Sequence, residues 1–219
     1  MKKYFNVIRK CPLFEGIEDN DLLGLLGCLG ATVMSFEKKY TIFTEGSRAR
    51  YLGIVLSGSA QIVQIDYYGN RSIIHEIVPS ELFGEAFACA ETETIPVTVI
   101  ANEDCEVLLI DCMRILHTCE NACGFHQRLI FNLMKDIATK AIMFQQKIEI
   151  ISKRSTREKL LAYLNIQARK NGSRSFVIPF DRQELADYLE VERSGLSAEI
   201  SKLRKEGIIN SNKNSFELL

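Results

Sequence analysis

Short β-prone runs separated by turn residues fill the stretch from Ala31 to Asp111. Gly, Ser, Asn and Asp gather between the runs, and no segment of helical period separates them. Strands that follow one another without helical crossovers argue against a parallel α/β sheet and predict an all-β barrel or jelly roll. The predicted strands are Thr32–Phe36, Thr41–Thr44, Tyr51–Leu56, Ala60–Asp66, Ser72–Val78, Pro96–Ala101 and Glu106–Ile110.

A different period begins near Phe125 and continues to about Ser152. Apolar residues recur there at steps of three and four, which predicts one long helix with a coiled-coil seam. Such a helix carries more apolar surface than one barrel would cover, so we expect it to form a dimer interface. A helix packed only against its own domain is the alternative. The predicted interface residues are Leu133, Ile137, Ala141, Phe144 and Ile148.

The C-terminal part contains two short helices joined by a tight turn. Asp181 and Glu184 have the spacing of a capping box, which predicts that the first helix starts there. The second helix runs from about Arg193 to Glu206, with a buried face of Leu196, Ile200 and Leu203. Residues 208–212 and 215–218 then flank Lys213 and Asn214 as a small hairpin, or wing. The turn position often filled by Gly is Glu190, where a positive φ would be strained.

This pattern predicts a winged helix-turn-helix, whose second helix reads DNA. Arg193 can contact guanine bidentately, and the neighbouring serines can reach bases or phosphates. The basic residues farther along suit phosphates. An αα-hairpin with a solvated polar face is the alternative. The predicted DNA-binding residues are Arg182, Gln183, Arg193, Ser194, Ser197, Lys202 and Lys205.

Charge is distributed unevenly along the 219 residues. Residues 152–219 hold 13 Lys and Arg against 9 Asp and Glu, whereas the net charge of the whole chain is −1. A basic C-terminal part suits nucleic-acid binding, because phosphate contacts supply much of the affinity. No signal peptide or membrane span is expected, which predicts a cytoplasmic protein without membrane partners. The sequence contains no nucleophile–base pair and no phosphate-binding loop, so we do not expect an enzyme.

Four motifs together resemble the Crp/Fnr superfamily of bacterial transcription regulators, over nearly the whole chain. They are Cys11-Pro-Leu-Phe, Gly53-Ile-Val-Leu-Ser-Gly-Ser, Glu81-Leu-Phe-Gly-Glu-Ala-Phe and Asp181-Arg-Gln-Glu-Leu-Ala-Asp-Tyr-Leu. The resemblance implies an α+β fold: an N-terminal cyclic-nucleotide-binding-like β jelly roll, a long dimerisation helix and a C-terminal winged helix-turn-helix. The expected boundaries are 1–124, 125–152 and 153–219. It also implies a homodimer on a palindromic operator in double-stranded DNA, an effector in the barrel, and RNA polymerase as a partner.

The effector is expected to be something other than cAMP or cGMP. In cyclic-nucleotide-binding relatives, the resemblance implies a Phe-Gly-Glu cassette whose Glu contacts the ribose and an Arg-Ser pair that grips the phosphate. This chain keeps the cassette, but Ile95 and Pro96 stand at the Arg-Ser position, and no Arg occurs from Ser72 to Met113. A buried phosphate without a cation would be poorly solvated. The predicted pocket residues are Phe83, Gly84, Glu85, Ala86, Ile95 and Pro96, and a retained structural turn is the alternative.

The seven cysteines leave a second hypothesis open, a redox-, metal- or haem-responsive regulator. The early cysteines Cys11 and Cys28 lack the tight clustering that an iron–sulfur cluster needs. The Cys and His ligands of carbon-monoxide haem sensors are absent near Phe83, although His75 remains a candidate for haem. Cys105 and His126 flank a further group whose spacing matches no common metal motif. The candidates within it for a metal or thiol switch are Cys112, His117, Cys119 and Cys123.

Reduced, buried thiols are the simpler interpretation of this cysteine group, because free Cys is a frequent core residue. A third hypothesis is a ligand-binding module without DNA function. The basic helix-turn-helix argues against it. The cofactor stays unknown at this point, with no strong pattern for cAMP, haem or an iron–sulfur cluster.

Overall fold

The computed structural model describes residues 2–116 and 125–219. Contacts divide the chain into two compact units, Met1–Gln64 with Ile74–Ala141, and Ile65–Ile73 with Ile142–Leu219. The division falls inside the long helix α5 (Phe125–Ile151), so the expected boundaries at residues 124 and 152 stay predictions. Within the described part of the chain, no helix is long and apolar enough to span a membrane.

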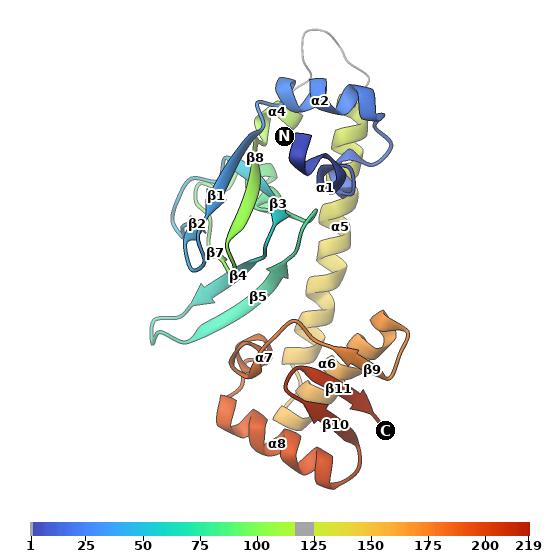
Figure 1. The fold of residues 1–219 in the computed structure, drawn as a ribbon. Coiled ribbons are helices and arrows are strands. Elements are labelled where there is room, and N and C mark those ends of the chain that lie inside the picture. Colours follow the sequence, from blue (N-terminus) through green and yellow to red (C-terminus); the bar gives the residue numbers. More distant parts are fainter. Residues whose placement is uncertain (1, 117–124) are drawn as a thin grey trace. The chain divides into compact units, whose positions relative to one another are not determined.

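The first unit contains two antiparallel sheets, except that residues 65–73, at one end of the second sheet, are grouped with the second unit. One has the order β1-β8-β3-β6, and the other has the order β2-β7-β4-β5. Figure 1 shows β1, β8 and β3 side by side, and β8 pairs with both neighbours along its length. The strands are β1 (Thr32–Phe36), β2 (Thr41–Phe43), β3 (Tyr51–Ser57), β4 (Ala60–Ile65), β5 (Arg71–Ile77), β6 (Leu82–Phe83), β7 (Thr98–Ala101) and β8 (Cys105–Asp111). All seven predicted strands are present, and β6 is an additional two-residue strand.

Short helices pack against the sheet that contains β3 and β8. They are η1 (Lys2–Tyr4), α1 (Phe5–Ile8), η2 (Pro12–Phe14), α2 (Asp19–Cys28), α3 (Glu85–Cys89) and α4 (Met113–Leu116). Their buried side chains join those of β3 and β8 in one core, to which α5 contributes Leu129 and Leu133. On the other face of β3, Gly53 lies against the ring of Phe83, which belongs to a second apolar cluster with Val55 and Val107; a Cβ at Gly53 would stand 2.2 Å from the ring. The cassette motif is therefore anchored by packing as well as by its turn.

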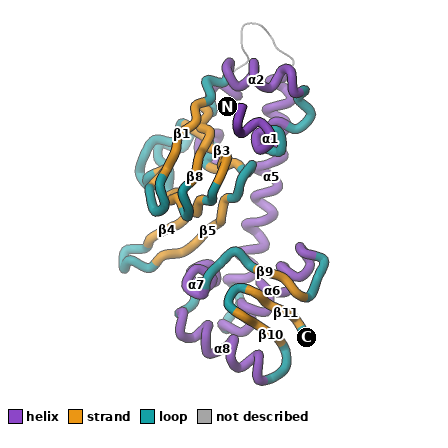
Figure 2. The backbone as a smooth tube through the Cα atoms, viewed as in Figure 1, coloured by secondary structure: helices purple, strands orange, loops and turns teal. Residues whose placement is uncertain are grey.

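The second unit holds the remaining helices and a three-stranded sheet of order β10-β11-β9 (Figure 2). Its elements are α6 (Thr156–Asn171), β9 (Ser175–Val177), α7 (Arg182–Leu189), α8 (Arg193–Lys205), β10 (Ile209–Asn212) and β11 (Ser215–Leu218). Helix α6 starts in a capping box of Ser155 and Glu158 and ends at Gly172, whose φ of 60° is accessible to Gly at little cost. Strands β10 and β11 form the predicted hairpin.

Candidate nucleic-acid interface and sensor cassette

Helix α7 begins as its sequence predicts. The Asp181 carboxylate accepts a hydrogen bond from the amide of Glu184, and the Glu184 carboxylate accepts one from the amide of Asp181, both at 2.8 Å. Leu185, Ala186 and Leu189 are buried. The capping box thus fixes the start of the helix and turns its apolar face to the core.

The turn after α7 places Glu190 in the left-handed region, at φ 53° and ψ 58°. The expected strain at this position is therefore present, because a side chain there is disfavoured relative to Gly. The ammonium group of Lys159 in α6 donates to the carbonyls of Leu189 and Glu190 at 3.2 and 3.1 Å. These bonds satisfy the last carbonyls of α7 and hold the turn. The sequence pattern gave no sign of this role for Lys159.

Helix α8 buries Leu196, Ile200 and Leu203, as predicted. Its opposite face begins with Arg193 and Ser194, which are exposed, and with Ser197, which is half-buried. Lys202 and Lys205 are exposed in its last turns. Figure 1 shows α8 along one side of the second unit, and the arrangement leaves a polar helix face open to a partner.

Two of the predicted DNA-binding residues already have partners within the unit. The guanidinium of Arg182 donates to the carbonyl of Lys213 at 3.2 Å and lies over the Phe216 ring, 5.7 Å from its centroid. Gln183 donates its side-chain amide to Asp187 at 2.8 Å. Arg182 therefore ties α7 to the wing, whereas Arg193 and Ser194 at the start of α8 are exposed.

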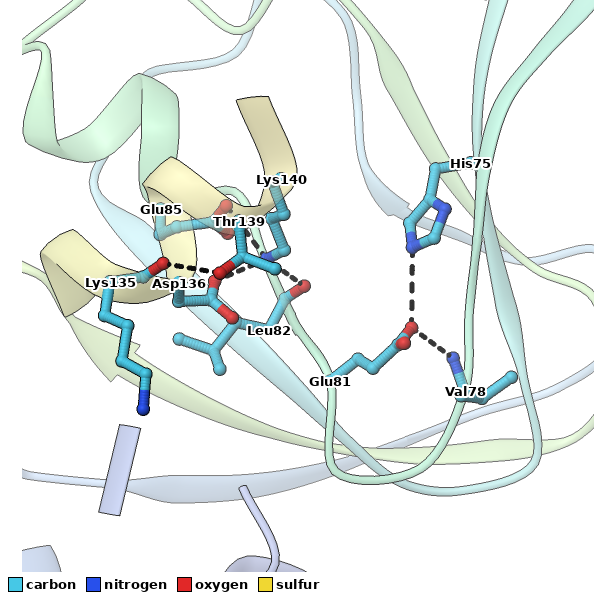
Figure 3. A network of polar contacts seen from close by, with 9 residues as sticks. All are labelled: His75, Val78, Glu81, Leu82, Glu85, Lys135, Asp136, Thr139 and Lys140. Carbon is cyan, nitrogen blue, oxygen red and sulfur yellow. Dashed lines mark hydrogen bonds and ion pairs between the residues drawn. The ribbon is translucent and has the colours of Figure 1, made fainter. Parts of the chain in front are cut away.

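A buried ion-pair network surrounds the cassette in the first unit (Figure 3). The ammonium group of Lys140 in α5 lies 3.0 Å from the Glu85 carboxylate and 2.8 Å from that of Asp136. It also donates to the carbonyl of Leu82 at 2.9 Å. The side chains of Glu85, Asp136 and Lys140 are only 5%, 10% and 15% exposed. The network thus joins the cassette helix α3 to α5 by desolvated charges.

The electrostatics of this network keep Lys140 charged. Burial acts to lower the pKa of Lys140, but the carboxylates of Glu85 and Asp136 outweigh it, and the pKa lies above its ordinary value. Burial raises the pKa of Asp136 against the opposing effect of Lys140. One oxygen of Glu85, Oε2, is buried without a hydrogen-bond partner among the described residues. One lysine thus serves two buried carboxyls, which leaves the network sensitive to its loss.

The structure places the six predicted pocket residues in different surroundings. The Phe83 ring packs on Gly53 and lies 5.1 Å from the Phe43 ring, and Glu85 is taken up by Lys140. Ile95 is buried, whereas Ala86 and Pro96 are exposed. A hollow of about 980 Å³ is lined by residues close in sequence to these, but by none of the six predicted pocket residues. It contains Arg48, Arg50 and Glu91, among others.

The cysteine group comes together only in part. His117, Cys119 and Cys123 lie outside the described residues. Cys112 is buried, and its sulfur lies 3.5 Å from that of Cys89. Among residues 2–116 and 125–219, no three His, Cys, Asp or Glu residues could hold a metal ion together. The haem candidate His75 lies 3.4 Å from the Glu81 carboxylate (Figure 3).

Both units match known protein families. Residues 33–121 match the cyclic nucleotide-binding domain, and residues 158–219 match the Crp-like helix-turn-helix domain. The chain belongs to the Crp/Fnr family of transcription regulators. The resemblance seen in the sequence is thereby confirmed, as is the α+β fold class.

Characterised relatives of this Crp/Fnr protein are distant. It is 24% identical over 187 residues to the transcriptional activator protein FnrL of Cereibacter sphaeroides, covering 80% of this chain and 71% of that protein. It is also 24% identical to the transcriptional activator protein anr of Pseudomonas aeruginosa, covering 95% and 84%. The structure of the c-di-GMP responsive global regulator CLP from Xanthomonas campestris has a TM-score of 0.75 at 16% identity, covering 92% of this chain and 99% of that chain.

Lys140, like Lys159, was not predicted from the sequence of this Crp/Fnr chain as a residue of either site. A signal was present, because Lys140 follows Leu133 and Ile137 at the apolar spacing of α5. A lysine in phase with buried positions requires a carboxylate or carbonyl partner. Asp136, four residues earlier on the same helix, was the partner within reach of sequence reasoning.

We predict that Lys140→Met strongly destabilises the first unit. Two buried carboxyls lose their cation, which typically costs about 3–5 kcal/mol of unfolding free energy. Lys135→Met is the matched control on the same helix, since Lys135 pairs with Glu15 in an exposed ion pair and its loss should change little. Urea unfolding followed by circular dichroism measures both variants. Equal, small effects would contradict a structural role for the network.

Proposed function

We propose that this chain is a homodimeric regulator whose α8 reads base edges in the major groove of operator DNA. The observation that carries the proposal is the exposed face of α8, which begins with Arg193 and Ser194 and continues to Lys202 and Lys205. Arginine near the start of a recognition helix suits a bidentate contact to guanine, and the later lysines suit phosphates. A symmetric dimer would meet half-sites about one helical turn apart. We propose RNA polymerase as a second partner of the regulator, besides DNA, and the cytoplasm as its location.

Arg193→Ala and Lys205→Ala should separate base reading from phosphate binding. We expect Arg193→Ala to weaken binding to the preferred site by about 1–3 kcal/mol and to relax base preference at one position per half-site. Lys205→Ala should weaken binding to all sequences alike and reduce the salt dependence. Selection from a randomised duplex pool, followed by competition binding, measures both effects. Unchanged selectivity in Arg193→Ala would contradict its proposed role.

The dimer interface that we propose lies on the exposed face of α5. The predicted seam needs one correction, because Leu133 is 2% exposed and packs in the core of its own unit. Ile137 is half-buried against the same core, and Phe144 is half-buried, whereas Ala141 and Ile148 are exposed. The apolar side chains without cover include Phe131 and Met134, at 53% and 61% exposure.

A second copy of the same helix is the proposed occupant of this face. Phe131, Met134, Ala138 and Ala141 recur at steps of three, four and three, which is the spacing of a two-helix seam. All four are exposed within the first unit. The small alanines allow two helices to approach closely, and the larger side chains fill the space between them. The interface is therefore shifted round the helix from the predicted seam.

Met134→Glu should weaken the dimer, because it sets like charges across the two-fold axis. Gln146→Glu is the control, since Gln146 is exposed on another face of α5. Sedimentation equilibrium of the wild type should give a dimer, Met134→Glu a tenfold or greater rise in the dissociation constant, and Gln146→Glu no change. A wild-type monomer at micromolar concentration would refute the proposal.

The effector that we propose is not cAMP or cGMP. Glu85, the residue expected to bind ribose, is committed to Lys140, and Ile95 is buried where the phosphate grip would stand. A cyclic nucleotide that drew Glu85 away from Lys140 would break a buried ion pair, and no Arg-Ser pair stands at residues 95 and 96 to hold its phosphate. The nearby hollow contains Arg48 and Arg50 but none of the cassette residues, and the Arg50 guanidinium already lies 2.8 Å from the Asp111 carboxylate.

Melting temperature in the presence of cAMP or cGMP tests this choice. A ligand that binds the folded state raises the melting temperature as its concentration rises. We expect no shift with either nucleotide up to millimolar concentration. A concentration-dependent rise that disappears in Glu85→Gln would show that the cassette binds cyclic nucleotides after all.

A further inference from the structure

Two cysteines from distant parts of the sequence meet in the first unit. Cys89 is the last residue of α3, and Cys112 follows β8 directly. Their sulfur atoms are 3.5 Å apart. A disulfide bond has a length near 2.05 Å, so closure needs roughly 1.5 Å of movement, which side-chain rotation and a small shift can provide. Cys11, Cys28 and Cys105, the other cysteines that the structure describes, make no such sulfur contact.

The two sulfurs differ in their access to solvent. Cys112 is fully buried within the core that α5 and the short helices share, and Cys89 is half-buried at the edge of that core. A small oxidant in solution therefore reaches Cys89 first, while Cys112 is held beside it. This arrangement of an accessible and an adjacent buried thiol is what a reacting and resolving pair requires.

The hydrogen bond between the sulfurs supports the same assignment. Either sulfur can donate; with the Cys112 thiol as the donor, the bond lowers the pKa of Cys89 in spite of its partial burial and the nearby Glu85. The pKa of Cys112 is raised by the same bond and by burial. By contrast, burial raises the pKa of Cys11 to about 12 and raises that of Cys105. Thiolate character is the main determinant of cysteine reactivity, so Cys89 is favoured over these two.

We propose that Cys89 and Cys112 form a reversible intramolecular disulfide, and that Cys89 reacts first with a peroxide. The Cys89 thiolate attacks one peroxide oxygen, the O–O bond breaks, and the departing oxygen leaves as water when hydrogen peroxide is the oxidant and a proton is taken up. The Cys112 sulfur then attacks the sulfur of the resulting sulfenic acid. The S–O bond breaks, and hydroxide leaves as water with the Cys112 proton. The two thiols lose two electrons, which the peroxide gains.

The bond would act on the cassette. Helix α3 spans only five residues, from Glu85 to Cys89. Its first residue holds Lys140 of α5, and its last would be fastened to the end of β8. Movement of Cys89 toward Cys112 therefore changes the position of a short helix that carries the buried carboxylate. The formation of the bond does not depend on the proposed DNA reading or on the dimer, so its test is separate from theirs.

The experiment uses the full chain, reduced with dithiothreitol, exchanged without oxygen and titrated with hydrogen peroxide. We expect free thiols to fall from the seven of the sequence to five. Peptide mapping should show one cross-link, between Cys89 and Cys112, with the loss of two hydrogen atoms. Dithiothreitol should restore both thiols. A link from either cysteine to another cysteine, or retention of both thiols at millimolar peroxide, would overturn the proposal.

Single variants assign the order of the two steps. Cys89→Ser should slow the first thiol loss about tenfold or more, and Cys112→Ala should stop at a sulfenic acid on Cys89 that dimedone traps. Cys28→Ser is the control, because Cys28 is exposed but has no neighbouring sulfur among the described residues, and it should leave the cross-link unchanged. Circular dichroism of each reduced variant confirms that it is folded. Trapping of a sulfenic acid on Cys112 in Cys89→Ser at the wild-type rate would reverse the order and refute the assignment.

Discussion

The ammonium group of Lys140 joins α3 to α5 in the buried ion-pair network of the first unit. It lies between the carboxylates of Glu85 and Asp136 and also donates to the carbonyl of Leu82. Three groups that each need a partner in a buried place thus share one cation. Buried ion pairs add little net stability, yet the loss of one partner is costly, so such a pair specifies an arrangement more than it strengthens it. What it specifies here is the position of α3 against α5.

The Lys140 network also explains why the cassette motif alone does not indicate that a ligand binds. Phe83 and Gly84 are needed for packing and for a tight turn, since Phe83 lies on Gly53 and Gly84 has a φ of 80°. A chain can retain both for structural reasons alone. Glu85 is the residue that would distinguish binding from structure, and its carboxylate is directed to α5 (Figure 3). These structural roles give a reason for the chain to keep the Phe83-Gly84-Glu85 motif although it lacks the Arg-Ser pair.

Features set by neighbouring residues were predictable from the sequence. The strands follow from alternating β-prone runs and turns, and the start of α7 follows from the three-residue spacing of Asp181 and Glu184. Features set by distant residues were not. Lys140 and Glu85 are 55 residues apart, and Lys159 reaches the turn after α7 from another helix. Periodicity records which face of an element is apolar, but it does not record what that face meets.

The long helix shows the same limit in one element. Its apolar spacing predicted a single seam. The helix instead has two apolar stripes: one packs against its own unit, and the other is exposed. Leu133 belongs to the first stripe and Met134 to the second, although they are adjacent in sequence. Successive residues on a helix point about 100° apart, so a small error in phase moves a prediction from one stripe to the other. Because Lys140 links the buried stripe of α5 to α3, a displacement of α3 would also displace α5, which carries the exposed stripe.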